Sequence, residues 1–430
     1  MKLPMMIYAN EKGEIFDHPY LEMVGRSGAS FRVPLVEELI PMPEGSELFL
    51  LPGRYPVGFN RKNGKIEVIE DDPFDSGKKV QAVAAFMAPA YTQILTAAYH
   101  TLPDAPILPL FSYTAVGWMD GKFWVCGVRV DDDTRQDIRY FDRKKVEKGV
   151  KEKLKNHSTN RLVRHLVKCA LTYGCPAANN YFLERWEAPL PTSPSCNARC
   201  LGCISLQKNS GFCASQERIS FVPRPEEIEE MAVEHLVKAE RAIVSFGQGC
   251  EGEPLLQGET LARSIDLIRK STSRGTVNLN TNGSLPSMVA KLMDSGLDSI
   301  RVSLNSCREK YFEAYYRPKG YCFSDLKKSI KNVKQKGGFA SINYLLLPGL
   351  NDEEEELDAL SSFIDETEID MIQMRNLNID PEWYLRKIGY KVSGKTIGIL
   401  NLMSYLSKRF PRLRFGYFNP PLDYVEKKSC

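Results

Sequence analysis

The chain contains the stretch Pro194-Ser-Cys-Asn-Ala-Arg-Cys-Leu-Gly-Cys203, which places three cysteines within eight residues at a Cys-x3-Cys-x2-Cys spacing. Thiolates select iron-sulfur clusters or zinc over hard cations. A 4Fe-4S cluster has four irons, so three cysteine ligands leave one iron open to a small molecule. This stretch therefore predicts an iron-sulfur site with Cys196, Cys200 and Cys203 as its ligands.

A structural zinc site is the alternative for the same cysteines. Such a site needs four ligands, and Cys213, ten residues after Cys203, offers the fourth. Zinc motifs usually pair two Cys-x2-Cys or Cys/His units, whereas here one such pair lies beside an x3 spacing with no histidine nearby. The spacing favours the cluster, and a zinc-stabilised binding protein is kept as the alternative.

The composition is typical of a globular protein with two domains. The chain has 430 residues, of which 43% are hydrophobic and 26% charged, and this gives enough apolar mass for packed cores. No stretch approaches the roughly 20 consecutive apolar residues of a membrane span, and the first residues lack the pattern of a secretory signal. Eleven cysteines without such a signal fit a reducing compartment. We therefore expect a cytoplasmic protein with no membrane contact.

The net charge of +3 says little about partners, but residues 135–168 are rich in lysine and arginine. Such a segment can be a footprint for nucleic acid, although a lysine-rich helix face is far more often simply solvated. We therefore do not expect nucleic acid as the partner, and keep modification of a nucleic acid as an alternative function.

Two dipeptides in the first half of the chain predict β-hairpins. Asn63-Gly64 and Asp120-Gly121 each lie between stretches rich in β-branched and aromatic residues, and both favour the turns with φ > 0 that close two-residue hairpins. A helical pattern follows from about residue 143 to residue 171, broken near 156–160. Residues 1–185 are therefore predicted to form a mixed α+β N-terminal domain that binds the substrate or a partner.

A proline-rich linker at residues 186–194 leads into a second pattern, in which strands and helices alternate. We predict strands at residues 242–246, 276–280, 299–304, 340–346 and 370–375. Such alternation indicates a parallel sheet covered by helices. With the strand that enters the cysteine loop it makes six units, fewer than the eight of a closed barrel. The predicted fold class is α/β, a partial (βα)6 TIM-like barrel at residues 195–420, open at one side and followed by a C-terminal tail at residues 421–430.

Polar residues alternate with apolar ones along these strands. The polar positions are Ser245, Asn278, Asn280, Arg301, Ser303, Asn305, Ser341, Asn343, Gln373 and Arg375. Side chains alternate across a strand, and the outer face must be apolar to receive the helices, so the polar set points inward. Since closed barrels normally fill their interior with branched apolar side chains, we expect a polar cavity whose groups pair with a ligand or water.

On these features the chain resembles the radical S-adenosylmethionine (SAM) superfamily, with a core like that of its activating enzymes. Members place a Cys-x3-Cys-x2-Cys loop after the first strand of a partial (βα)6 barrel. The likeness covers residues 191–420. Besides the cysteine loop it rests on three motifs, Gly249-Cys-Glu-Gly-Glu-Pro-Leu-Leu256, Asn280-Thr-Asn-Gly283 and Leu347-Pro-Gly-Leu-Asn-Asp352.

The resemblance implies roles for individual residues. Gly252 would offer backbone contacts to the cofactor. Glu253 would accept a charge-assisted hydrogen bond from the ammonium group of its methionine moiety. Further cofactor-binding positions by this match are Asn280 and, for the ribose and carboxylate groups, Ser303 and Asn305.

Gly202 departs from the family pattern, because an aromatic residue usually stands just before the third cysteine. In the family, the main chain of this residue addresses the adenine of the cofactor. Gly202 is therefore expected to keep the main-chain contact with the adenine while the stacking contact is lost.

The resemblance also implies the cofactors, a 4Fe-4S cluster and S-adenosyl-L-methionine. Reductive cleavage of SAM would give methionine and a 5′-deoxyadenosyl radical that abstracts a hydrogen atom, while the protein positions the cofactor and excludes water. The expected partners are an electron donor such as flavodoxin or ferredoxin and a substrate, a small molecule, peptide or protein, that the sequence does not identify. Asn343 and Arg375 are the candidates for substrate contact, with bracing of the barrel wall as the alternative.

The other cysteines and the histidines show no obvious ligand spacing. Cys126, Cys169, Cys175 and Cys250 are scattered along the chain, and isolated cysteines are usually small buried hydrophobic residues. His165 likewise shows no ligand spacing. We therefore expect no second metal site from these residues.

Overall fold

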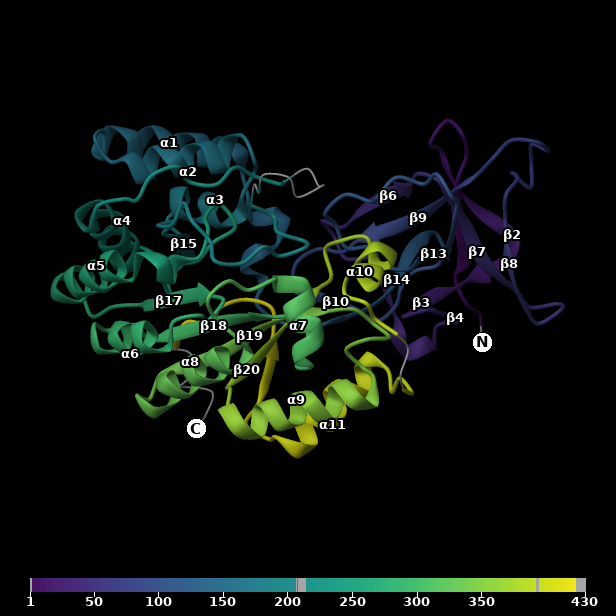
Figure 1. Cartoon of the computed structure of the whole chain (residues 1–430). Helices are drawn as coiled ribbons and strands as arrows, with labels where there is room; N and C mark the ends of the chain where they lie inside the picture. The colour runs from purple at the N-terminus through teal and green to yellow at the C-terminus, as the bar shows by residue number, and fades with distance from the viewer. Residues whose placement is uncertain (1, 206, 208–213, 392–393, 423–430) are drawn as a thin grey trace.

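The computed structural model describes residues 2–205, 207, 214–391 and 394–422. The first part of the chain is antiparallel β-structure, drawn in purple and blue in Figure 1. Its strands are β1 (Met5–Ala9), β2 (Ile15–Met23), β3 (Gly25–Ser27), β4 (Ser30–Arg32), β5 (Leu39–Pro41), β6 (Glu47–Leu51), β7 (Arg54–Asn60), β8 (Lys65–Val68), β9 (Gln81–Phe86), β10 (Tyr91–Gln93), β11 (Thr96–Ala97), β12 (Tyr99–Thr101), β13 (Val116–Met119) and β14 (Lys122–Arg129). Eleven of them form one sheet, and β11, β3 and β4 form a small second one.

Both predicted hairpins are present in this sheet, but only the second has the expected two-residue loop, since residues 61–64 join β7 to β8. β7 pairs with β8 around Gly64, and β13 pairs with β14 around Asp120 and Gly121. The φ angles of these three residues are 72°, 52° and 75°. Positive φ at the turn is what the Asn-Gly and Asp-Gly dipeptides supply at low cost.

Three helices follow the antiparallel strands: α1 (Arg143–Asn156), α2 (Arg161–Leu171) and α3 (Pro176–Phe182). The predicted break lies between α1 and α2, where the side chain of Asn160 accepts hydrogen bonds from the N–H groups of Leu162 and Val163. This is an N-cap, which satisfies two otherwise unpaired donors of the first turn. A new helix therefore starts here.

The second half of the chain forms a seven-stranded sheet in the order β15-β16-β17-β18-β19-β20-β21. Its strands are β15 (Glu187–Pro189), β16 (Ile243–Phe246), β17 (Thr276–Thr281), β18 (Ser299–Leu304), β19 (Phe339–Leu346), β20 (Met371–Asn376) and β21 (Arg414–Gly416). All neighbouring pairs are parallel. The α/β class is thus confirmed, and β16 to β20 begin and end within one residue of the predicted strands.

Two features of this sheet differ from the expectation. β15 lies inside the segment predicted as a linker, where Glu187 to Pro189 pair with β16. β21, which the sequence did not predict, pairs with β20, so the sheet has one strand more than the six expected. β21 has three residues, too few for the alternating pattern to be recognised.

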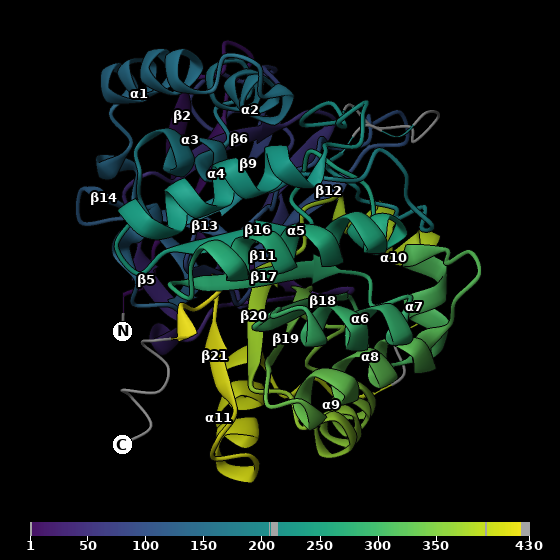
Figure 2. The same cartoon turned by 90° about the vertical axis from the view of Figure 1, so that its left-hand side faces the viewer.

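Eight further helices lie along the sheet: α4 (Pro225–Lys238), α5 (Gly258–Ser271), α6 (Pro286–Asp294), α7 (Glu309–Tyr316), α8 (Phe323–Gln335), α9 (Glu354–Thr367), α10 (Pro381–Lys387) and α11 (Ile399–Arg409). Figure 2 shows α4, α5, α6, α8 and α9 on the outer side of the strands. The apolar strand residues Val244, Val277 and Ile300 belong to one buried cluster with the apolar faces of these helices. Helix α2 contributes Leu162 and Leu166 to the same cluster, so α1 to α3 pack on the second half of the chain.

The N-terminal β-structure lies against the carboxyl ends of β19 and β20. The hydroxyl of Thr92 donates to the carbonyl of Met374 at 2.8 Å. Arg54 and Asp380 form a buried ion pair of 2.7 Å. The antiparallel domain therefore stands beside the end of the sheet where the cysteine loop begins. None of the helices in the described part of the chain combines the length and apolar character that crossing a bilayer requires.

Candidate functional site

The cysteine loop is held in place by main-chain hydrogen bonds to the end of α7. The N–H of Arg199 donates to the carbonyl of Tyr316 at 2.9 Å, and that of Leu201 to the carbonyl of Tyr315 at 3.0 Å. The N–H of Lys319 in turn donates to the carbonyl of Asn197 at 2.9 Å. These bonds fix the backbone between the first and third cysteines.

The loop that follows β16 runs directly alongside. The N–H groups of Gly252 and Glu253 donate to the carbonyls of Ser193 and Ser195 at 2.7 and 2.8 Å. A Cβ atom added to Gly252 would lie 1.9 Å from the carbonyl oxygen of Ser195, a distance that no side chain tolerates. The close approach of the cysteine loop therefore requires glycine at residue 252. This structural reason is different from the predicted one, which was a backbone contact with the cofactor.

Glu253 holds a buried carboxylate at this junction, with 4% of the residue exposed. Its oxygens accept hydrogen bonds from the Thr281 hydroxyl at 2.5 Å, the Asn282 N–H at 2.8 Å and the Leu255 N–H at 3.1 Å. No lysine, arginine or histidine of the described chain lies within ion-pair distance of it. Burial raises the pKa of Glu253 to about 7, since a charged group without an opposite charge is costly in the interior. The site is therefore suited to a cationic or hydrogen-bond-donating ligand.

Glu251 has a role that the sequence analysis missed. One carboxylate oxygen accepts from the N–H groups of Thr192 and Ser193 at 2.8 and 2.9 Å, and the other from those of Gly247 and Gln248 at 2.6 and 3.1 Å. The side chain thus joins the segment that enters the cysteine loop to the end of β16. Its position in place of the family's first glycine was the available signal.

The three sulfurs of the loop are not gathered as ligands of a single ion. At least two of the sulfur atoms of Cys196, Cys200 and Cys203 are more than 4.8 Å apart. The ligand atoms of one tetrahedral zinc ion lie about 3.5–3.8 Å apart. Burial raises the pKa of Cys196 to about 11, so this thiol must release a proton when it binds iron. Cys213, the fourth ligand of the zinc alternative, lies outside the described residues. The spacing thus favours a cluster over zinc.

Gly202 belongs to the cysteine loop and packs against Tyr315. A Cβ atom at residue 202 would lie 3.1 Å from the Tyr315 hydroxyl and 3.4 Å from Ile379 Cδ1, so a larger side chain would displace one of them. The absence of the usual aromatic residue is thus compatible with the local packing. A contact between Gly202 and the adenine stays a prediction.

The remaining predicted cofactor residues lie in different surroundings. The amide of Asn280 donates to the carbonyl of Phe246 at 3.0 Å. Asn305 is fully buried, and its Nδ2 donates to Tyr384 Oη at 3.1 Å while its Oδ1 lacks a partner. Ser303 is half-buried on β18. Cofactor contacts by these three residues stay predictions, and the buried Oδ1 of Asn305 has no hydrogen-bond donor among the described residues.

The predicted polar interior of the barrel exists, and part of it is filled by the protein itself. The side chain of Asn419, from the segment after β21, bonds to Glu187 at 2.7 Å, to Gln373 at 3.0 Å and to Asn280 at 3.2 Å. These residues belong to β15, β20 and β17, which are not neighbours in the sheet, so their side chains meet inside it. Because buried amides need partners, Asn419 satisfies groups that were expected to face a ligand.

Two guanidinium groups share this interior. Arg301 donates to Gln373 at 3.1 Å, and its Nε has no acceptor in the part of the chain that the structure describes. Arg375 donates to the carbonyl of Tyr417 at 3.1 Å and lies 4.1 Å from the centre of that ring, which supports the bracing alternative for this residue. Burial and, to a smaller extent, the charge of Arg375 lower the pKa of Arg301 to about 10. Neither arginine forms an ion pair in the described chain. The Oδ1 of Asn343 is also buried without a partner.

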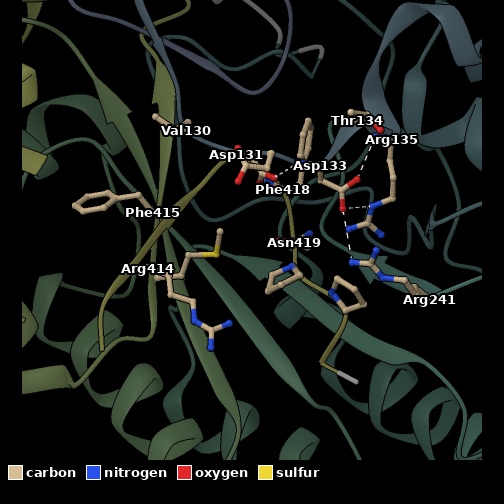
Figure 3. A pocket seen from close by; sticks show the side chains of 14 residues that line it. Val130, Asp131, Asp133, Thr134, Arg135, Arg241, Arg414, Phe415, Phe418 and Asn419 are labelled. Atoms are coloured by element: carbon tan, nitrogen blue, oxygen red, sulfur yellow. Dashed lines mark hydrogen bonds and ion pairs between the residues drawn. The ribbon is translucent and has the colours of Figure 1, made fainter. Parts of the chain in front are cut away.

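A cavity of about 540 Å³ opens at the opposite end of the strands (Figure 3). Met371 and Arg414, the first residues of β20 and β21, line it together with Asp131. Asp131 accepts from the N–H groups of Tyr417 and Phe418 at 2.9 and 3.1 Å, so it anchors the segment that leads to Asn419. Since the cysteine loop follows the carboxyl ends of the strands, this cavity is separate from the site.

Several basic residues of the segment 135–168 are paired with acids. Ion pairs join Lys153 to Glu184 and Glu234, Arg161 to Glu227, Arg143 to Glu147 and Lys168 to Glu217. Lys153 is buried, so its charge is turned away from solvent. The nucleic-acid alternative is not favoured by this pairing.

Residues 190–360 match the model of the radical SAM superfamily. This segment is therefore a radical SAM domain, and the cofactors of that superfamily are a 4Fe-4S cluster and S-adenosyl-L-methionine. This agrees with the sequence-based assignment of the cysteine loop, and the zinc alternative is not favoured.

Three known proteins illustrate the similarity. The FeMo cofactor biosynthesis protein NifB of Klebsiella pneumoniae is 28% identical over 180 residues, 38% of this chain and 37% of that protein. The mitochondrial GTP 3′,8-cyclase of Arabidopsis thaliana is 26% identical over 233 residues, 51% of each chain. The structure of a radical SAM methyltransferase from Sphaerobacter thermophilus covers 54% of this chain and 66% of its own at 13% identity with a TM-score of 0.38, too low to support a conclusion about activity. The chain thus spans between 37% and 51% of the two curated relatives.

Proposed function

We propose that the protein uses its cysteine loop and Glu253 to cleave SAM reductively and to abstract a hydrogen atom from a substrate with an anionic group. The observation that supports SAM cleavage is the buried Glu253 carboxylate. It has no cationic partner among the described residues, and its main chain bonds to the residue that precedes Cys196. A ligand with an amino group would supply the missing partner through a charge-assisted hydrogen bond.

The residues present fit the two cofactors. Cys196, Cys200 and Cys203 would hold three irons of the cluster, and Glu253 would receive the amino group of SAM. When bound, the reduced cluster and SAM supply a 5′-deoxyadenosyl radical, the species that takes the hydrogen atom. The chain's own part is to fix the loop through Tyr315 and Tyr316 and to position the ligand.

The substrate class is inferred from Arg301 and Arg375. Both face the interior of the sheet without an acidic partner in the described chain, and burial of an unpaired charge is costly. A carboxylate or phosphate group on the substrate would pair with them. Asn343 lies on β19, the strand next to that of Arg301, and is paired in register with Ser303 and Gln373. It would donate or accept one further hydrogen bond.

The N-terminal domain, residues 1–185, is proposed to close the side of the barrel next to β20. Its ion pair between Arg54 and Asp380 lies just beyond that strand. Such a position would let it exclude water from the substrate and contribute contacts. An electron donor such as flavodoxin or ferredoxin is proposed as the second partner.

Deuterium transfer from labelled candidate substrates into 5′-deoxyadenosine tests the substrate assignment. In Arg301→Gln and Arg375→Gln, the KM for the substrate is expected to rise about tenfold or more, the effect of losing a hydrogen bond to a charged group. SAM cleavage without substrate should be unchanged, and the exposed Arg409→Gln serves as the control. A preferred substrate without an anionic group, or an unchanged KM in both variants, would refute the assignment.

A further inference from the structure

Three soft side chains converge at a place that the radical SAM site does not use. His165 and Cys169 lie one turn apart on α2, and Cys250 lies in the loop after β16. Their ligand atoms, an imidazole nitrogen and two sulfurs, all lie within 4.8 Å of one another. The expectation that these cysteines are isolated is therefore wrong, because the fold joins residues that are far apart in sequence.

The spacing of these atoms matches a tetrahedral metal site. His165 Nε2 and Cys169 Sγ are 3.6 Å apart. With Zn–S bonds of ~2.3 Å and Zn–N bonds of ~2.0–2.1 Å, ligand atoms at the corners of a tetrahedron lie about 3.5–3.8 Å apart. The present positions therefore need little adjustment to receive an ion.

The surroundings also favour a metal over solvent-exposed thiols. Cys169 and Cys250 are 1% and 2% exposed, and neither forms a disulfide. His165 is half-buried, with its ring against Phe221. Thiolate and imidazole ligands together select zinc among the common divalent cations of the cell.

We propose that His165, Cys169 and Cys250 form a second metal site that binds Zn²⁺ or a similar thiophilic divalent cation. A tetrahedral ion held by three side chains has one position left for water or a further ligand. The site ties helix α2 to the loop that carries Glu251 and Glu253. It is distinct from the three cysteines of the cluster loop and does not depend on the proposed activity.

The test uses the full chain with Cys196, Cys200 and Cys203 changed to Ala, so that the cluster loop cannot bind metal. After dialysis against a weak chelator, elemental analysis is expected to find about one zinc per chain. Titration with Co²⁺ should give the visible bands of tetrahedral cobalt together with a thiolate-to-cobalt charge-transfer band. These two measurements do not need substitutions at His165, Cys169 or Cys250, so they remain valid if changes at those residues impair folding.

Single changes then locate the ion. Cys169→Ser, Cys250→Ser and His165→Ala are each expected to lower zinc affinity about tenfold or more, since even loss of an outer-shell partner costs 10–100-fold. Cys126→Ser, at a buried cysteine of β14 outside the group, is the matched control and should leave it unchanged. Folding of each variant is checked by circular dichroism. A folded parent without stoichiometric metal, a disulfide between Cys169 and Cys250, or zinc that survives both serine changes would overturn the proposal.

Discussion

The N–H of Glu253 donates to the carbonyl oxygen of Ser195 at 2.8 Å, so the main chain that carries the carboxylate suited to SAM is hydrogen-bonded to the residue before Cys196. The proposed cluster ligands and the proposed SAM ligand are therefore parts of one backbone unit. A change that displaces one side of this contact is expected to disturb the other.

Gly252→Ala tests this coupling. The new methyl group would collide with the carbonyl of Ser195, because its Cβ would lie 1.9 Å from that oxygen. We expect a large loss of iron after reconstitution together with a lower thermal unfolding temperature. Gly394→Ala, at an exposed glycine with no atom within 4 Å of the added Cβ, is the control. Full iron content in Gly252→Ala would show that the contact is not needed.

Glu253→Gln tests the role of the carboxylate. Removing its charge is expected to weaken SAM binding by about 1.5–3 kcal/mol, the usual contribution of a hydrogen bond to a charged group. Equilibrium dialysis of the reconstituted protein under anaerobic conditions measures this change. The visible absorbance of the cluster should be retained, since no cysteine is altered. Equal SAM affinity in the variant and the wild type would rule out this role.

The affinity for SAM should also depend on pH. Burial raises the pKa of Glu253 to about 7 in the free protein, so the carboxyl group is mostly protonated below that pH and must lose its proton to accept the amino group. Binding is therefore expected to strengthen about tenfold from pH 6 to pH 8. In Glu253→Gln this rise should be absent, and a rise of the same size there would assign it to another group.

Asp380→Asn tests the contact between the antiparallel domain and the barrel. The Asp380 carboxylate accepts from Arg54 at 2.7 Å and from the N–H of Leu108 at 3.1 Å, and both charges are buried. Leaving the Arg54 charge unpaired should cost about 3–5 kcal/mol of unfolding free energy, measured by urea denaturation. Asp365→Asn, whose partner Arg409 lies on the surface, should change the midpoint little. Equal midpoints in the two variants would contradict a structural role for the buried pair.

Local patterns in the sequence predicted the strands and the cysteine loop. The alternation of Asn278 and Asn280 with apolar neighbours shows which face of β17 points inward, because the period of a strand is two residues. Likewise, the cysteine spacing is contained in one loop. These features could be predicted without knowing which distant segments come into contact.

Contacts between distant segments were harder to predict. Asn419 fills the interior from a segment beyond β21, and Cys250 reaches α2 only because the loop after β16 passes beside that helix. The spacing of His165 and Cys169, one turn apart on a predicted helix, was nevertheless readable, since residues four apart share a helix face. The unusual position of Glu251 was visible in the sequence, but its role was not, because the N–H groups that it satisfies converge only in the fold.

The most direct test of the central claim is the formation of 5′-deoxyadenosine by the anaerobically reconstituted, reduced protein supplied with SAM. We predict that the wild type and Cys322→Ala, which changes an exposed cysteine, both form this product, and that Cys200→Ala forms none. Product formation that persists in Cys200→Ala, or a wild type that holds the cluster and forms no product, would contradict the account.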